Sequence, residues 1–193
     1  MSTEAARNEM RFAHQYIEAF YKTKDVPRRQ QHLEHALRYI AKARTFDPAA
    51  TIEVKTTDNK IGVATLDLME SEVLFHQANV IDAHKTTEEH RRIVIPKLKQ
   101  AIDLSPNIPT YQVVLANMYM ADNNRNAAIS LLQQAQQNFP LDFHVRATLD
   151  DIQAKPAWGL PPVSTNMSPA GILFLFMVIV FAVALVAFTM RPH

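Results

Sequence analysis

The sequence predicts an all-α protein built from stacked antiparallel helix pairs, with a small β-hairpin insert and one C-terminal transmembrane helix. Three observations lead to this prediction. Apolar residues recur at helical spacing in blocks that end at proline, one short segment alternates apolar and polar residues, and residues 170–190 carry no charge. The chain of 193 residues is long enough for one ordinary domain ahead of that apolar segment.

Charge and composition exclude several classes of protein. Of the 20 Lys and Arg, only Arg191 follows the apolar segment, so residues 1–169 carry 19 of them against 19 Asp and Glu. This neutral balance argues against nucleic-acid binding, which needs a basic surface. The sequence has no cysteine, which excludes disulfides, thiolate metal clusters and cysteine nucleophiles. Its three glycines are isolated, so a P-loop and a dinucleotide-binding turn are also excluded.

Residues 170–190 are the strongest single feature. About 20 helical residues span roughly 30 Å, the thickness of the bilayer core. A buried helix of a soluble core is shorter and keeps a polar face, which this segment lacks. Residues 1–10 are polar with no signal-peptide core after them, and only residues 191–193 follow the span. We therefore expect a tail anchor that leaves the N-terminal domain in the cytoplasm, and favour a bacterial inner membrane over an organelle outer membrane.

A proline-rich segment joins the domain to this anchor. Residues 156–169 hold four of the eleven prolines, so we expect an extended linker. Trp158 lies inside it. Its ring fits the membrane interface, but packing on the domain is an equal alternative.

Blocks of helical spacing, each ending at a proline, recur along the chain. Between Pro109 and Pro140, the turn at residues 122–124 separates two helical stretches. Small or apolar side chains mark the positions where the two helices meet: Leu115, Ala116 and Tyr119 in the first, and Ala128, Leu132 and Ala135 in the second. Earlier in the chain, Leu98, Ala101 and Pro106 repeat the spacing of Leu132, Ala135 and Pro140.

A third unit ends at Pro48, with Ala36, Ile40 and Ala43 at matching positions. We expect its first helix within residues 4–21, followed by a long loop. Beyond Pro140, apolar residues at helical spacing predict a helix that covers the last apolar face: Leu141, Val145, Leu149 and Ile152.

These residues resemble the tetratricopeptide-repeat (TPR) family over residues 4–155, and the units that end at Pro106 and Pro140 match the family's period of about 34 residues. The resemblance implies a solenoid of about three helical hairpins plus a capping helix, within a domain of residues 1–155. The family's first helices line a concave face that binds a peptide, and an Asn after the small residue of a first helix often bonds that peptide.

Here Asn79 follows Ala78, and Asn117 follows Ala116. Phe75, Val113 and Met120 are expected on the same face by helical spacing, and complete the predicted partner-binding set. The alternative for both Asn residues is ordinary polarity of a helix surface.

A segment of alternating residues lies between the first two units, at about residues 50–65. Ile52 and Val54, then Ile61 and Val63, alternate with polar or small residues. We expect a β-hairpin with these four side chains on one apolar face. A plain loop is the alternative.

No constellation of catalytic residues is present, so we expect no enzyme activity and no cofactor. His32 and His35 share one helix face, but no third metal ligand is evident, and we predict no metal site.

The sequence therefore favours a non-catalytic adaptor that binds a protein partner through its helical array and holds it at a lipid bilayer, with no nucleic acid involved. The alternative is an accessory or assembly subunit of a larger membrane complex. In that case small residues such as Gly171 and Ala182 let the span pack against other transmembrane subunits.

Overall fold

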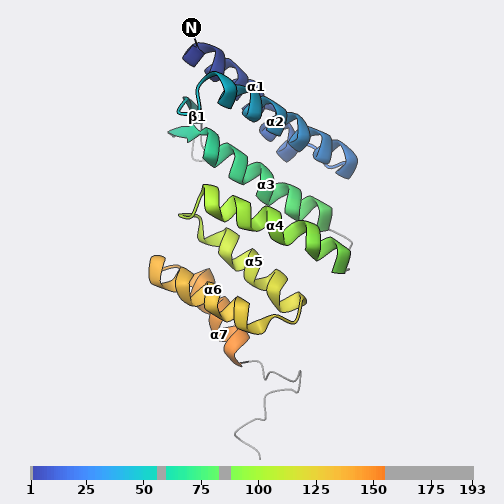
Figure 1. Cartoon of the computed structure of the whole chain (residues 1–193), viewed down its shortest axis with the longest axis vertical. Coiled ribbons are helices and arrows are strands. Elements are labelled where there is room, and N and C mark those ends of the chain that lie inside the picture. Colours follow the sequence, from blue (N-terminus) through green and yellow to red (C-terminus); the bar gives the residue numbers. More distant parts are fainter. Residues whose placement is uncertain (1, 56–59, 83–87, 155–193) are drawn as a thin grey trace, which may run out of the picture. The chain divides into compact units, whose positions relative to one another are not determined.

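The computed structural model describes residues 2–55, 60–82 and 88–154 (Figure 1). These residues form seven helices and one two-stranded antiparallel sheet, which confirms the all-α class and the hairpin insert. In chain order the elements are α1 (Ser2–Lys22), α2 (Val26–Phe46), β1 (Thr51–Lys55), β2 (Ile61–Thr65), α3 (Leu66–Asp82), α4 (Glu88–Leu104), α5 (Pro109–Ala121), α6 (Arg125–Asn138) and α7 (Phe143–Ala154).

Within residues 2–152 the helices pack in pairs that follow one another in chain order. Helix α1 packs with α2, α3 with α4 and α5 with α6, and α2–α3 and α4–α5 contacts join the pairs (Figure 1). Most described helices start at a residue whose side chain accepts a hydrogen bond from a backbone N–H of the first turn. These caps are Asp25 for α2, Thr65 for α3, Asn124 for α6 and Asp142 for α7.

The loop predicted to be long in the first unit is short. Only residues 23–25 separate α1 from α2. The two helices are instead longer, with 21 residues each. Pro27 does not prevent this extension, because it lies in the first turn of α2, where a backbone N–H has no intrahelical acceptor.

The second helix of each pair buries the same three positions. Nine residues, each no more than 1% exposed, occupy them: Ala36, Ile40 and Ala43 in α2, Val94, Leu98 and Ala101 in α4, and Ala128, Leu132 and Ala135 in α6. Alanine at all but one of the triplet ends permits close helix contact, while the central Ile or Leu fills the space between helices.

The spacing of these triplets follows the predicted repeat. The α4 and α6 triplets are separated by one repeat length of about 34 residues, as the sequence predicts. The α2 and α4 triplets lie further apart, because the β-hairpin is inserted between α2 and α3. The insert therefore lengthens the chain between two units without changing which positions the second helices bury.

Arginines at the start of α4 and α6 join successive units. The Arg91 Nε donates to the Asp122 carboxylate at 2.8 Å, at the end of α5. The Arg125 guanidinium, at the equivalent position of the next unit, donates to the Ile152 carbonyl at 2.9 Å, in the last turn of α7. Both bonds place a cation at a helix C-terminus, where the helix dipole favours positive charge.

The hairpin register corrects one expectation. Ile52 pairs with Ala64, and Glu53 pairs with Val63. Because side chains alternate along a strand, Ile52 and Ala64 are buried, whereas Val63 lies on the outer face and is 62% exposed. Ile61 lies on that outer face too, at 71% exposed. The four apolar residues of the hairpin therefore do not share one face, because a register shifted by one residue reverses every side chain of a strand.

Helix α7 covers the apolar face of the last pair, as predicted. Val145, Leu149 and Ile152 are at most 4% exposed and pack with Ala116 and Leu132. The prediction was wrong for Leu141, which is 92% exposed. Leu141 precedes the capping residue Asp142, so it lies outside the helix and its periodicity.

The predicted linker at residues 156–169, the predicted span at 170–190 and the tail at 191–193 lie outside the described residues. In the part of the chain that the structure describes, no helix has the length and apolarity needed to cross a bilayer.

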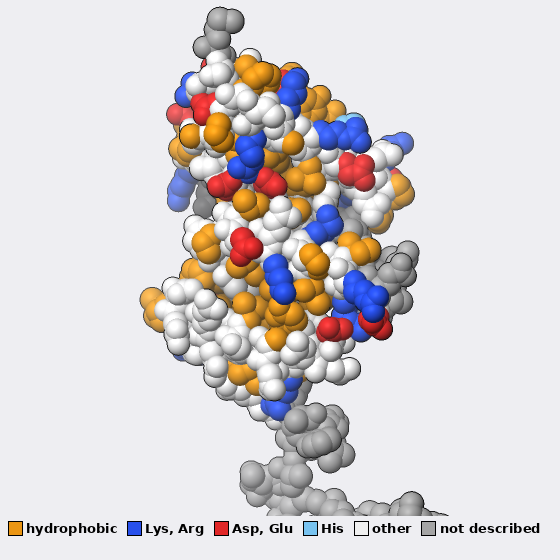
Figure 2. Space-filling model, in the orientation of Figure 1, with side chains coloured by type: hydrophobic (Ala, Val, Ile, Leu, Met, Phe, Trp, Pro, Cys, Tyr) orange, Lys and Arg blue, Asp and Glu red, His pale blue; other side chains and the backbone are white. Residues whose placement is uncertain are grey.

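Acidic and basic side chains are interspersed on the described surface. Figure 2 shows both signs on one face without a large block of either. Ion pairs account for part of this mixing, since Arg44 of α2 lies 2.9 Å from Asp67 and 2.6 Å from Glu70 of α3.

Replacement of Leu98 by Ala will destabilise the array. It empties space at a fully buried position, and such changes cost about 2–5 kcal/mol of the free energy of unfolding. Urea unfolding of the full chain in mild detergent, followed by circular dichroism, measures this cost. Leu141→Ala is the matched control at an exposed site and will change stability by less than about 0.5 kcal/mol. Equal effects of the two substitutions would contradict the packing described here.

Candidate functional site: the hairpin groove

A groove of about 570 Å³ lies between α1, the β-hairpin and α3. We call it the hairpin groove. Nine residues line it: His14, Ile17, Glu18, Tyr21, Val54, Lys55, Ala64, Met69 and Glu72. Two first helices of successive pairs thus supply two of its sides and the insert supplies the third, so the site depends on contacts between residues far apart in the sequence.

The apolar lining of the groove belongs to the core of the N-terminal units. Ile17, Ala64 and Met69 are at most 5% exposed and pack in one cluster with the buried residues of α1 and α2. Val54 is partly buried against the same cluster. Because these side chains are held by the packing around them, the groove is formed in advance of any binding event.

The junction between the hairpin and α3 places these residues. Thr65 is both the last residue of β2 and the cap of α3, and its Oγ1 accepts from the Leu68 N–H at 3.1 Å. The strand therefore runs into the helix without a loop. Ala64 on the strand and Met69 in the first turns of the helix both line the groove.

A polar chain joins α1 to α3 at the rim. The Tyr21 hydroxyl donates to the Glu72 carboxylate at 2.7 Å and lies 2.7 Å from the Nε2 of His76. A hydroxyl has one proton, so Tyr21 accepts from a protonated Nε2 of a neutral His76. Partial burial, followed by the hydrogen bond to Glu72, raises the pKa of Tyr21, which keeps its proton for this bond.

His76 is held neutral by its surroundings. Its ring lies 4.7 Å from Phe20 and 5.2 Å from Tyr21, measured between ring centroids. Burial, and then the charge of Arg29, lower the pKa of His76 to about 4. The Arg29 guanidinium lies 4.3 Å above the Phe20 ring. At this part of the rim the neutral Tyr21 hydroxyl holds the Glu72 carboxylate, and the neutral His76 contacts that hydroxyl.

The structure places the two predicted asparagines on the surface. Asn79 of α3 and Asn117 of α5 are both exposed, and each follows a fully buried alanine. Asn79 lies two helical turns after Glu72 on the same helix, so both residues occupy one face. Helix α1 repeats this arrangement, since the buried Ala13 precedes His14, which lines the groove.

The three apolar residues of the predicted set fall into two places. Phe75 stacks on Tyr111 of α5, with ring centroids 4.7 Å apart. Val113 and Met120 pack against the cluster formed by α5, α6 and α7. All three are partly buried, so much of each side chain is used by the fold. Each lies within about one helical turn of an asparagine, Phe75 before Asn79 on α3, and Val113 and Met120 on either side of Asn117 on α5.

Sequence reasoning missed the residues of the hairpin groove. One local signal was available, because His14, Glu18 and Tyr21 follow the i, i+4, i+7 spacing of a single helix face. The contributions of Val54, Lys55 and Glu72 had no such signal, since they depend on how the hairpin packs on two helices.

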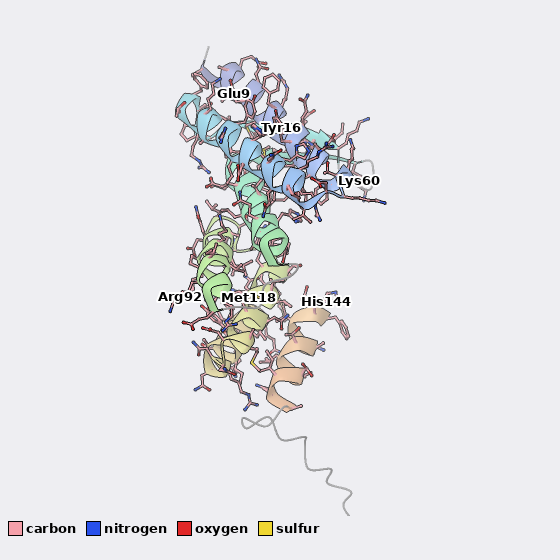
Figure 3. All side chains as sticks on the ribbon, turned by 90° about the vertical axis from the view of Figure 1, so that its right-hand side faces the viewer. Glu9, Tyr16, Lys60, Arg92, Met118 and His144 are labelled. Atoms are coloured by element: carbon pink, nitrogen blue, oxygen red, sulfur yellow. The ribbon has the colours of Figure 1, made fainter. Side chains whose placement is uncertain are left out.

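His32 and His35 both lie against the ring of Tyr16, which stacks on His35 and is tilted relative to His32. Tyr16 of α1, labelled in Figure 3, lies 4.9 Å from His35 and 6.0 Å from His32, measured between ring centroids. Among the described residues, no three or more potential metal-ligating side chains lie together.

Comparison with known proteins finds similarity in structure but no match by sequence. No protein-family model and no curated protein matches the sequence. One similar solved structure is a thermophilic TPR protein of Thermus thermophilus, with 19% sequence identity and a TM-score of 0.43. The match covers 75% of this chain and 62% of that protein, so this chain spans less than two thirds of its length. At this identity and TM-score the likeness does not establish membership of that family.

The partly buried His76 makes the stability of the fold depend on pH. The folded chain holds its pKa near 4, below the unfolded value of 6.5. The stability that comes from the neutral ring is therefore complete above pH 6.5 and is lost as the pH falls toward 4, with a slope of at most about 1.4 kcal/mol per pH unit. We expect His76→Gln to flatten this part of the dependence.

Urea midpoints at about pH 7 and about pH 4.5 test this expectation. His144→Gln is the matched control, since His144 is exposed at the start of α7 (Figure 3). A pH dependence that His76→Gln and His144→Gln leave equally unchanged would show that His76 does not contribute.

Proposed function

We propose that the protein is a non-catalytic, TPR-like partner-binding protein that is held at a membrane by residues 170–190. The hairpin groove is the observation that carries the partner-binding part. It offers an apolar, preformed lining with polar groups at its rim, on a side formed by the first helices α1 and α3. Such a surface suits a segment of another protein that adds side chains to an existing core.

The repeated packing supports the TPR-like part of this proposal. The buried triplets of α4 and α6 keep the period of about 34 residues of that repeat, and the arginines at their starts keep it as well. Repeats of this kind stack into an extended surface whose residues come from successive units. Asn79 and Asn117 are exposed on two successive first helices, and we propose that they extend the binding surface beyond the hairpin groove.

The membrane part of the proposal rests on composition. Residues 170–190 contain no charged residue, and their length matches the hydrocarbon core. In this proposal the proline-rich residues 156–169 act as a spacer, the helical domain is cytoplasmic, and the bilayer belongs to a bacterial inner membrane. If the protein is instead a permanent subunit of a larger complex, Gly171 and Ala182 would lie against a neighbouring transmembrane helix.

Removal of residues 170–190 will release the protein from membranes. A flotation gradient of cell membranes measures this. The full chain will float with the vesicles, and the truncated chain will stay in the soluble fraction, since the apolar span supplies the lipid-buried surface. Continued flotation of the truncated chain after a high-salt wash would show that the anchor lies elsewhere.

Replacement of both Asn79 and Asn117 by Ala will weaken partner capture several-fold, because it removes the two exposed amides that, in this proposal, bond the backbone of the partner. Pull-down with the full chain in mild detergent measures the recovery, and urea unfolding checks that the fold is kept. The matched control replaces Gln100 and Gln134, which are exposed amides at equivalent positions of α4 and α6. Unchanged recovery with the asparagine variant would contradict a binding surface on these first helices.

Size exclusion in mild detergent distinguishes an adaptor from a permanent complex subunit. A partner that stays with the chain through the column indicates a complex subunit. A lone chain that still captures a partner in the pull-down indicates an adaptor.

A further inference from the structure

We infer that the hairpin groove binds an extended segment of a partner protein that carries a large apolar side chain next to a Lys or Arg. This inference rests on the proposed partner-binding function and specifies the chemistry of the partner. It comes from three properties of the groove: its apolar lining, a carboxylate held in place without a cation, and the balance of charge along the rim.

The lining fits one large apolar side chain. Ile17, Ala64 and Met69 present apolar surface at the base of a space of about 570 Å³, and Val54 adds to it from β1. A space of this size accepts a large apolar side chain together with neighbouring main-chain atoms, since ligand pockets commonly measure about 300–1,000 Å³. The groove is also partly open to solvent, so the main chain of an extended segment can pass over it while a side chain enters.

Glu72 is the second property. Its carboxylate is positioned by the Tyr21 hydroxyl at 2.7 Å, yet no cation lies within ion-pair distance of it among the described residues. Neighbouring acids differ, since Glu70 pairs with Arg44 at 2.6 Å and Glu18 pairs with Lys22 at 3.3 Å. A carboxylate that is partly buried and fixed by a neutral donor keeps its negative charge available for a cation from outside.

The residues that line the groove carry more acidic than basic charge. Glu18 and Glu72 both line the groove, against the single cationic lining residue Lys55. The Glu18–Lys22 pair is exposed, with side chains 53% and 76% accessible, so it is weak and open to exchange. A Lys or Arg beside the apolar side chain of the partner would lie between Glu18 and Glu72, which complements this charge.

A displayed library of random peptides of about 12 residues, which extend to about 40 Å, tests the inference on the full chain in mild detergent. We expect enrichment of sequences with Lys or Arg next to a large apolar residue. The strongest enriched peptide is then synthesised with a neutral fluorescent label, and its Kd is measured by fluorescence polarisation.

Two variants with opposite expected effects make the test specific. Glu72→Gln keeps an oxygen that accepts from Tyr21 but removes the charge. We expect it to raise the Kd of the peptide about fivefold. Lys55→Gln removes the opposing cation, and we expect it to lower the Kd of the peptide about twofold. Glu34→Gln, at an exposed position of α2, is the matched control and will leave the Kd unchanged.

The outcomes separate this inference from the proposed function. Enrichment of acidic peptides, or a Kd that is indifferent to Glu72 and Lys55, overturns the inference. If replacement of Asn79 and Asn117 then raises the Kd of the peptide, the partner-binding function stands and the site lies elsewhere on the first helices. Absence of any enriched peptide overturns both.

Discussion

Two helices pack at short distance only where small side chains face each other, and this chain places alanine at such points in every helix pair. Ala13 of α1, Ala78 of α3 and Ala116 of α5 are completely buried, and the alanines at the ends of the triplets in α2 and α6 are at most 1% exposed. One leucine or isoleucine per second helix then fills the remaining space. This close contact holds each pair together, and the α2–α3 contacts between the first two pairs bring α1 and α3 to the two sides of the hairpin groove.

The β-hairpin turns the space between α1 and α3 into a site. A two-stranded hairpin is marginal alone in water, and here it is held because Ile52 and Ala64 are buried against the helices. Its register directs Val54 and Ala64 into the groove and Val63 away from it. The insert therefore has both a structural and a functional consequence, since it completes the first units and supplies one wall of the proposed binding site.

Charged residues are used in two ways. Between units, Arg44 contacts Asp67 and Glu70, and Arg91 contacts Asp122, so these acids are neutralised within the array. At the groove, Glu72 is instead held by the hydroxyl of Tyr21, next to a histidine that burial keeps neutral. Neutral partners fix the position of a carboxylate without cancelling its charge, which distinguishes the groove from the inter-unit contacts.

Local pattern in the sequence was enough to determine the helices, the repeat spacing, the capping helix and the presence of a hairpin, because each depends on which face of one segment is apolar. The partner-binding role of Asn79 and Asn117 stays a prediction of the same local kind, as does the membrane span at residues 170–190. Tertiary structure alone decided the hairpin register, the exposure of Leu141 and the bond between Tyr21 and Glu72, which come from different helices. Periodicity specifies which face of a helix or strand is apolar but not how those faces pack. The groove therefore exists only where α1, the hairpin and α3 pack together.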